Sequence, residues 1–116
     1  MANKHLKIRI YNGGTVAMGP GKAELLETID TCGSISSAAK QMQMSYRRAW
    51  ELVDVMNKCF NQPVVTSASG GQHGGGAHLT DFGRFILKSY RDLVVKAQLA
   101  TELELNQILS NLNQSE

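Results

Sequence analysis

The sequence has few cysteines, prolines and aromatic residues, and it lacks a long hydrophobic run. Its 116 residues include 2 cysteines, 2 prolines and 6% aromatics. Cys32 and Cys59 form neither a CxxC pair nor a disulfide framework, so we expect two buried free thiols and a reducing, cytoplasmic environment. No apolar stretch reaches the roughly 20 residues of a membrane-spanning helix, and the N-terminus lacks the apolar core of a signal peptide. The sequence therefore predicts a cytoplasmic protein with no membrane partner.

Charge is distributed unevenly along the chain. The formal net charge is +2, but residues 1–96 hold all 12 Lys and Arg against seven acids, and residues 97–116 hold three acids and no base. A basic region suits a polyanionic partner such as nucleic acid. A surplus this small is equally compatible with solubility alone, so charge by itself leaves both interpretations open.

The first third of the chain predicts one strand and one helix. Residues 6–11 (LKIRIY) alternate apolar and polar side chains, which predicts a half-buried strand. Residues 12–21 (NGGTVAMGPG) read as a loop because of their glycines and proline. Apolar residues then recur at spacings of three and four up to Cys32, which predicts a helix, and Gly33 suits its left-handed C-terminal cap.

Two further helices follow, joined by a short link. Ser34 is a suitable N-cap for a helix with a narrow alanine-rich apolar face, and Ser45 is a suitable N-cap for a helix over about residues 45–60. Two capped helices separated by a tight turn predict a helix-turn-helix, in which the second helix is the recognition helix.

The rest of the chain predicts a hairpin and a long helix. Residues 64–68 and 77–80 are strand-like and flank a glycine-rich stretch, which predicts a β-hairpin wing over about 64–79. Thr80 can cap one helix of about 30 residues that reaches about Leu112 and spans about 45 Å. A small domain cannot cover that length, so we expect a second copy to cover the distal half. The predicted dimerisation residues are Ile86, Tyr90, Leu93, Ala97, Ala100, Leu105, Leu109 and Leu112.

This order of elements predicts a mainly α fold with a small β-hairpin. It corresponds to a winged helix-turn-helix DNA-binding domain over residues 1–80 and a long C-terminal dimerisation helix over residues 81–116. The expected partners are double-stranded DNA and a second copy of the chain.

The start of the recognition helix carries the candidate base-reading residues. Arg47 and Arg48 lie where side chains reach base edges in the major groove, and arginine can grip guanine with two hydrogen bonds. A solvated surface pair is the alternative. Tyr46 and Trp50 lie one turn apart, and Trp50 either contacts the DNA backbone or covers the edge of the core. Glu51 either orients an arginine, accepts from cytosine, or is solvated.

Two other segments are candidates for backbone contacts. Ser36 and Ser37 lie in the first turn of the preceding helix, where hydroxyls suit phosphate contacts, although local capping explains them equally well. The predicted wing tip holds Gly71, Gln72, His73, Gly74 and Gly75. Its glycines let the backbone lie close to a sugar-phosphate chain, and an unstructured loop is the alternative.

The same glycine-rich stretch matches no chemical motif. It lacks the Lys-Ser/Thr pair of a phosphate loop and a following helix, and it does not fit a dinucleotide fingerprint. His5, His73 and His78 lack the spacing of zinc ligands, and we find no catalytic triad or dyad. We therefore expect no enzyme activity, no cofactor and no metal site.

Two motifs in this order carry a family resemblance. "GSISSAAKQMQMSYRRAWELVDVMN" followed by "GGQHGGGAHLTDFGRFIL" resembles the N-terminal domain of the molybdate-responsive ModE transcription regulators, and more distantly the LysR-type head. The resemblance covers about residues 6–95. It implies a winged helix and a homodimer on palindromic operator DNA, with Ser45 to Arg48 opening the recognition helix, residues 70–76 as the wing and the terminal helix as dimer interface.

The sequence departs from the family pattern in two places. Full-length members carry a C-terminal molybdate-binding region, whereas this chain ends in a helix, so we expect a stand-alone DNA-binding protein whose effector is unknown. Family wings usually place a lysine where this chain has Gln72 and His73, which implies weaker, less salt-dependent wing contacts. Two alternatives stay open: a winged-helix module that binds protein, and a direct oxyanion or metal sensor.

Overall fold

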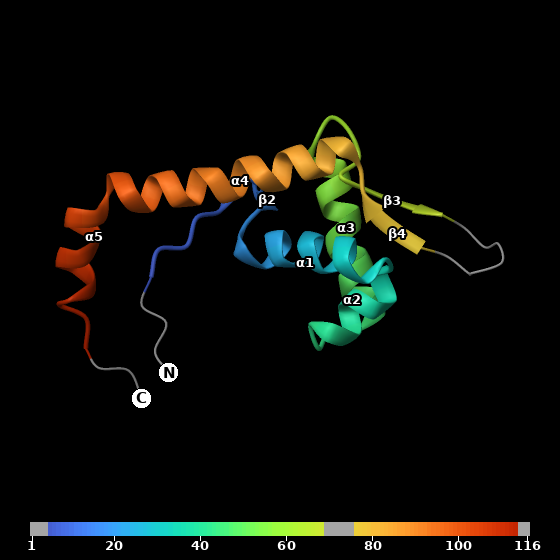
Figure 1. Ribbon diagram of the computed structural model, residues 1–116, viewed down its shortest axis with the longest axis horizontal. Coiled ribbons are helices and arrows are strands. Elements are labelled where there is room, and N and C mark those ends of the chain that lie inside the picture. The colour runs from blue at the N-terminus through green and yellow to red at the C-terminus, as the bar shows by residue number, and fades with distance from the viewer. Residues whose placement is uncertain (1–4, 69–75, 114–116) are drawn as a thin grey trace.

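The computed structural model describes residues 5–68 and 76–113, which form helices and two small antiparallel hairpins (Figure 1). In chain order the elements are β1 (Ile10–Asn12), β2 (Thr15–Met18), α1 (Pro20–Cys32), α2 (Ile35–Gln41), α3 (Tyr46–Cys59), β3 (Val65–Ala68), β4 (Gly76–Leu79), α4 (Asp81–Ala100) and α5 (Glu102–Leu109). The predicted mainly α winged helix-turn-helix is confirmed.

The N-terminal segment differs from the prediction. Strand β1 is only three residues long and has no buried residue, and its partner β2 lies within the predicted loop. The reason is the pair of glycines between them: Asn12 pairs with Thr15, and Gly13 has a φ of 61°, so a two-residue turn closes a hairpin. The expectation of a half-buried strand over residues 6–11 is wrong. The strand covers only Ile10–Asn12, and the buried side chains of this hairpin, Ala17 and Met18, belong to β2.

The predicted caps of the helix-turn-helix are confirmed. Gly33 ends α1 with a φ of 81°, which is the left-handed conformation. The Oγ of Ser34 accepts from the Ser37 amide at 3.0 Å, and the Oγ of Ser45 accepts from the Arg48 amide at 3.0 Å. Each serine therefore satisfies an amide that the helix itself leaves unpaired, and together they fix where α2 and α3 begin.

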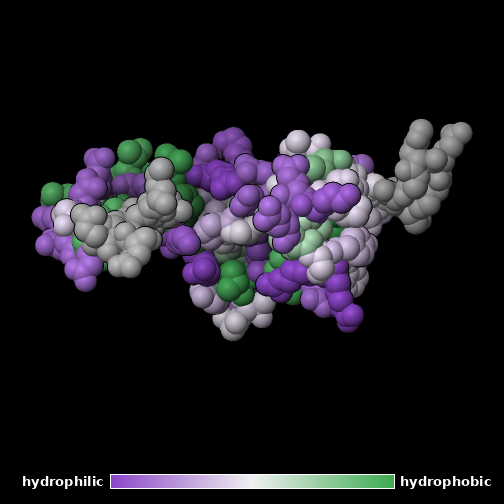
Figure 2. Space-filling view, turned by 90° about the horizontal axis from the view of Figure 1, so that it is seen from below, coloured by the Kyte–Doolittle hydropathy of each residue, from purple (hydrophilic) through white to green (hydrophobic). Residues whose placement is uncertain are grey.

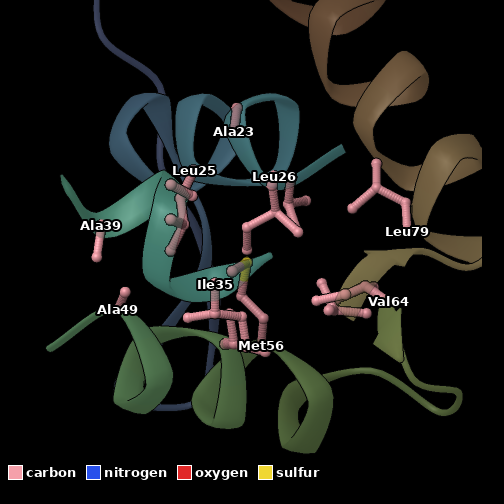
Figure 3. Packing of buried hydrophobic residues seen from close by; sticks show 14 of the residues in the cluster. Ala23, Leu25, Leu26, Ile35, Ala39, Ala49, Met56, Val64 and Leu79 are labelled. Carbon is pink, nitrogen blue, oxygen red and sulfur yellow. The ribbon is translucent and has the colours of Figure 1, made fainter. Parts of the chain in front are cut away.

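The core lies between α1, α2, α3 and the base of the second hairpin. Ala39 of α2 and Ala49 of α3 point toward each other at the closest approach of these helices, while Leu26 and Met56 fill the space toward the hairpin (Figure 3). All four of these side chains are almost fully buried. Small alanines let the two helices approach closely, which fixes the recognition helix against the rest of the domain.

The second hairpin is anchored at its base. Strand β3 pairs with β4 from Val65 opposite Leu79 to Ala68 opposite Gly76, and the amide of Ala77 donates to the Gly33 carbonyl at 2.9 Å. The hairpin projects away from the helices (Figure 1). Its predicted tip lies outside the described residues: Gly71, Gln72, His73, Gly74 and Gly75.

The C-terminal helix differs from the prediction because it is interrupted at Thr101. Helix α4 ends at Ala100, and α5 turns away from its axis (Figure 1). The Thr101 hydroxyl donates to the Ala97 carbonyl at 2.7 Å, a side-chain bond to the preceding turn that is known to bend helices. The expectation of one continuous helix to about Leu112 is therefore wrong.

Two of the predicted dimerisation residues, Tyr90 and Ile86, contact the core of their own chain. Tyr90 is only 3% exposed, and its hydroxyl donates to the Ile8 carbonyl at 2.6 Å. Ile86 packs against the buried core as a partly buried residue. An apolar stripe shows which side chains are covered but does not show whether the covering surface is in the same chain.

The two cysteines lie at the ends of α1 and α3. Both are free and partly exposed, so the expectation of buried thiols is wrong. The Sγ of Cys32 is 3.3 Å from Oε1 of Gln41. Within residues 5–68 and 76–113, no helix combines the length and apolarity needed to cross a membrane.

Candidate nucleic-acid interface

The first turn of α3 projects its side chains away from the domain. Ala49, Val53 and Met56 face the core. Tyr46 lies on the same face as Val53, seven residues later, but at the N-terminal end of the helix, where it is 56% exposed. Arg47 lies on the opposite face, and its side chain is 88% exposed, compared with 52% for Arg84 and 42% for Arg91 on α4. Helix α3 is thus held by one face and presents the opposite face of its N-terminal half to solvent, as a recognition helix must.

The two arginines predicted to act together point in different directions. Arg47 makes a 3.5 Å ion pair with Glu51 one turn later, on the open face of α3. Glu51 therefore contacts an arginine, which was one of the three roles considered for it, and the exposed geometry means that the pair contributes little stability. Arg48 instead lines a cavity beside Lys22 at the start of α1. The structure therefore supplies one arginine on the open face and one on its flank.

Trp50 lies on the other flank of α3. It is 49% exposed and does not belong to the buried cluster, although it shares a depression with the buried residues Ile35 and Val53. It lines a shallow depression between α3 and β3 together with Asn57 and Ser67. An exposed indole beside a hairpin offers an N–H donor and a flat apolar face to a partner.

The N-terminus of α2, the start of α3 and the hairpin meet around one hollow. A cavity of about 230 Å³ is lined by Ser36, Tyr46, Ser67 and Gly76 among others. Ser37 is exposed beside Ser36, and its amide is already bonded to the Ser34 hydroxyl. Ser34 is therefore the residue that caps α2, and the Ser37 hydroxyl has no role in that cap. Among the described residues, the Ser36 hydroxyl contacts only the Ser34 hydroxyl, at 3.4 Å.

Sequence reasoning missed two residues of this surface. Lys40 lines a hollow with Ser36 and Ser37 on the exposed side of α2, and Ser67 is exposed on β3. The helical spacing of Lys40 from Ser36 was a usable signal, because residues four apart share a helix face. Ser67 had no comparable signal, since its neighbours come from a distant part of the chain.

Cations on this side of the molecule differ in pairing from those on α4. On α4, Arg84 pairs with Asp30 at 3.1 Å, Lys88 pairs with Asp92 at 2.8 Å, and Arg91 pairs with Glu27. Lys40 and Arg48 form no ion pair with any described residue, although Arg47 and Lys58 on α3 do; on α4 only Lys96 lacks a described partner. Positive charge near α2 and α3 is thus less compensated than on α4, which favours binding of a polyanion there.

No family model matches the chain. It is 42% identical over 86 residues to the molybdenum transport protein ModE of Azotobacter vinelandii, covering 74% of this chain and 32% of the relative. It is 35% identical over 98 residues to the transcriptional regulator ModE of Haemophilus influenzae, covering 84% of this chain and 38% of the relative.

A third relative is the DNA-binding transcriptional dual regulator ModE of Escherichia coli K12. It is 39% identical over 79 residues, which cover 68% of this chain and 30% of the relative. The chain thus spans about a third of the length of these three relatives. Their names describe regulators and a transport-linked protein, and none describes an enzyme.

Proposed function

We propose, on the premise that this chain belongs to the ModE family over the segment it shares with those regulators, that it is a sequence-specific DNA-binding regulator acting as a homodimer on palindromic operators. The observation that carries this proposal is the exposed first turn of α3, where Arg47 is 88% exposed beside Tyr46. Helix α3 enters the major groove, and its first-turn side chains read base edges.

The neighbouring elements position the domain on the DNA backbone. Ser36 and Ser37 at the start of α2, together with Lys40, face the phosphates on one side of the groove. Hairpin β3–β4 reaches the adjacent backbone, with Ser67 and Trp50 at its base. The name of the Azotobacter relative supports molybdenum metabolism as the regulated process.

The dimer is supported by the exposed apolar side chains of the distal part of α4 and of α5. Those that are at least 48% exposed are Val95, Leu99, Leu103 and Ile108, together with Leu112, which follows α5. Hydrophobic side chains gather at this end of the molecule (Figure 2). Solvent-exposed apolar patches of this kind mark interaction sites, and a symmetric dimer would bury the patch against its own copy.

The direct test is the selection of bound sequences from random DNA, followed by affinity measurements on the selected site. The double variant Arg47→Ala/Arg48→Ala is expected to lose about 1 to 3 kcal/mol for each arginine that contacts a base. The matched control Lys88→Ala/Lys96→Ala removes two positive charges from α4 and is expected to retain most of the affinity.

Two results would contradict the proposal. The first is the absence of any enriched sequence for the wild-type protein at low salt. The second is an affinity that hardly depends on salt, because release of counterions from phosphates makes DNA binding fall steeply with added salt. A weak salt dependence would instead support a module that binds protein.

A further inference from the structure

A second cavity lies on the flank of α3 opposite the hairpin. It has a volume of about 320 Å³ and lies between the start of α1 and the N-terminal half of α3. Lys7, Arg9, Lys22 and Arg48 line it, and its lining includes no acidic residue. We call it the cationic cavity. Its apolar lining consists of Val16, Met42, Met44 and Leu52, with Pro20.

The four cations of the cationic cavity lack counterions. None of them forms an ion pair with a described residue, in contrast to Arg84, Lys88 and Arg91 on α4. Burial lowers the pKa of Lys22, and the charges of Arg48 and Arg9 lower it further, while Cys59 acts in the opposite direction. Like charges from three segments are therefore held close together without an acid between them, an arrangement that an anion would stabilise.

The backbone adds donors at the same place. Helix α1 begins at Pro20 and has no side-chain cap, so the first-turn amides of Gly21 and Lys22 have no capping acceptor. The stem of Arg9 lies over the N-cap residue: a Cβ added at Gly19 would be 3.3 Å from Cγ of Arg9. Arg9 is thus placed at the positive end of α1, where partial positive charge also favours an anion.

We propose that the cationic cavity binds the phosphate group of a phosphate ester. The cations and the amides of α1 provide the donors, and the apolar lining contacts the carbon skeleton of the ester. Phosphate suits this donor set because lysine acts as a point charge and arginine can form two parallel bonds to phosphate oxygens.

Two kinds of phosphate ester fit this cavity, and the position of Arg48 on α3 favours the first. Trp50 faces the β3 side of α3, and Arg48, two residues away, lies about 200° around the helix axis. The cavity therefore flanks the recognition helix on the side away from the hairpin, where a second DNA strand would run. A backbone phosphate of DNA is the first source, which rests on the proposed function, and a free phosphorylated small molecule is the second.

The first arm of the test measures DNA affinity against salt concentration. The variant Arg9→Gln/Lys22→Gln is compared with Lys88→Gln/Lys96→Gln, which removes the same charge from α4. Each phosphate contact contributes about 0.9 to the slope of log affinity against log salt. A backbone phosphate in the cavity predicts a slope lower by about one in the first variant and unchanged in the second, with both variants unfolding at the wild-type temperature.

The second arm titrates isotope-labelled protein with inorganic phosphate at constant ionic strength, with chloride as the reference salt. Binding predicts saturable shifts of the Gly21 and Lys22 amide resonances in the wild type and in the α4 control, and none in Arg9→Gln/Lys22→Gln. If the cavity binds a free small molecule, the amide resonances shift with phosphate but the salt slope of DNA affinity is the same in the cavity variant as in the wild type. If the cavity binds a DNA phosphate, the salt slope is lower in the cavity variant, whether or not inorganic phosphate shifts the amide resonances.

The inference is overturned if neither arm responds, or if the α4 control changes as much as the cavity variant. Failure of the proposed function is a separate result: a wild-type protein that binds no DNA removes the first arm, and the phosphate titration alone then decides whether the cavity is an anion site.

Discussion

The near and distal parts of the C-terminal helices have similar apolar content and different environments. Over residues 81–94, α4 lies on the domain: Gly83 and Tyr90 are buried, and Ile86 and Val94 pack against the core. Beyond that point Leu99 is 69% exposed and Leu103 is 66% exposed. The near part is also tied to α1 by ion pairs from Arg84 and Arg91, whereas the first turn of α5 is acidic.

This contrast shows that an apolar pattern does not identify the surface that covers it. The near part is covered because α1 and the second hairpin lie beneath it. The distal part extends past the end of α1 (Figure 1), and its side chains Val95, Leu99, Leu103 and Ile108 are at least 54% exposed, whereas Leu105 and Leu109 are partly buried. The near part therefore belongs to the stability of one domain, and we assign the distal part to the proposed dimer.

The largest expected effect comes from breaking the distal part. Leu99→Ser/Leu103→Ser removes four leucine side chains from a symmetric dimer, and burial of each contributes about 1.5 kcal/mol or more. We expect the dimer dissociation constant to rise more than about 1000-fold, with little change in the unfolding temperature of the domain measured at low concentration. Light scattering across a concentration series measures the mass.

Phe85→Ser is the matched control for this variant. Phe85 is 63% exposed but lies on the near part of α4, so its replacement is expected to leave the mass unchanged. A wild-type protein that is monomeric at micromolar concentration, or a double variant that remains dimeric, would contradict the assignment of the distal part.

The second largest effect is expected from a substitution at Gly83, which lies in the near part of α4. A Cβ built there would lie 2.1 Å from the Val64 carbonyl oxygen, so α4 packs directly on backbone. We expect Gly83→Ala to cost about 3 kcal/mol of unfolding free energy, the upper part of the range for overpacking, because backbone cannot move aside as a side chain can. Urea unfolding measures it.

Gly21→Ala is the control for the glycine substitution. The added Cβ meets no atom within 4 Å, and Gly21 lies in the first turn of α1. Alanine is the better helix former, so this variant is expected to be as stable as the wild type or slightly more stable. Equal stability of the two variants would show that α4 tolerates displacement from Val64.

Features set by neighbouring residues were predictable from the sequence. Ser34, Ser45 and Thr80 were predicted as N-caps, and each accepts a hydrogen bond from an amide three residues later. Gly33 was predicted as a left-handed cap. The helix-turn-helix follows from these signals because capping depends on a few consecutive residues.

Features set by distant residues were not predictable in the same way. The close approach of Gly83 to Val64 depends on how separate segments meet, and so do the hydrogen bonds of the Asn57 side chain, which donates one bond to the Val65 carbonyl and accepts two from the Val64 and Val65 amides. The cationic cavity likewise joins Arg9, Lys22 and Arg48 from three segments. Local sequence patterns do not show which distant segments meet, so the sequence indicated the open face of α3 and not the proposed anion site on its flank.

The break at Thr101 is an intermediate case. Its signal is local, since a threonine hydroxyl can bond to the carbonyl four residues earlier, but continuous apolar spacing through this region favoured one helix. The spacing was the weaker guide because exposed apolar residues do not hold a helix straight unless a partner surface lies against them.

The smallest expected effect tests how the near part holds the N-terminal segment. Tyr90→Phe removes the 2.6 Å hydrogen bond to the Ile8 carbonyl and leaves the buried ring in place. We expect a loss of about 1 kcal/mol at neutral pH, the usual net value of such a bond. Tyr11→Phe, at a tyrosine that is 58% exposed, is the control and should show no change.

The pH dependence of the unfolding free energy, compared between the wild type and Tyr90→Phe, tests the same hydrogen bond further. Burial raises the pKa of Tyr90 above its ordinary value of 10.0, although Arg91 and Arg9 act in the opposite direction. The folded protein therefore holds the phenolic proton more tightly than the unfolded chain, so the stability that Tyr90 contributes is complete below pH 10 and declines as pH rises through the folded pKa. Urea unfolding at increasing pH should thus show that the wild type loses its greater unfolding free energy relative to Tyr90→Phe. If the difference in unfolding free energy stays constant above pH 10, the Tyr90 hydroxyl is not held in the core.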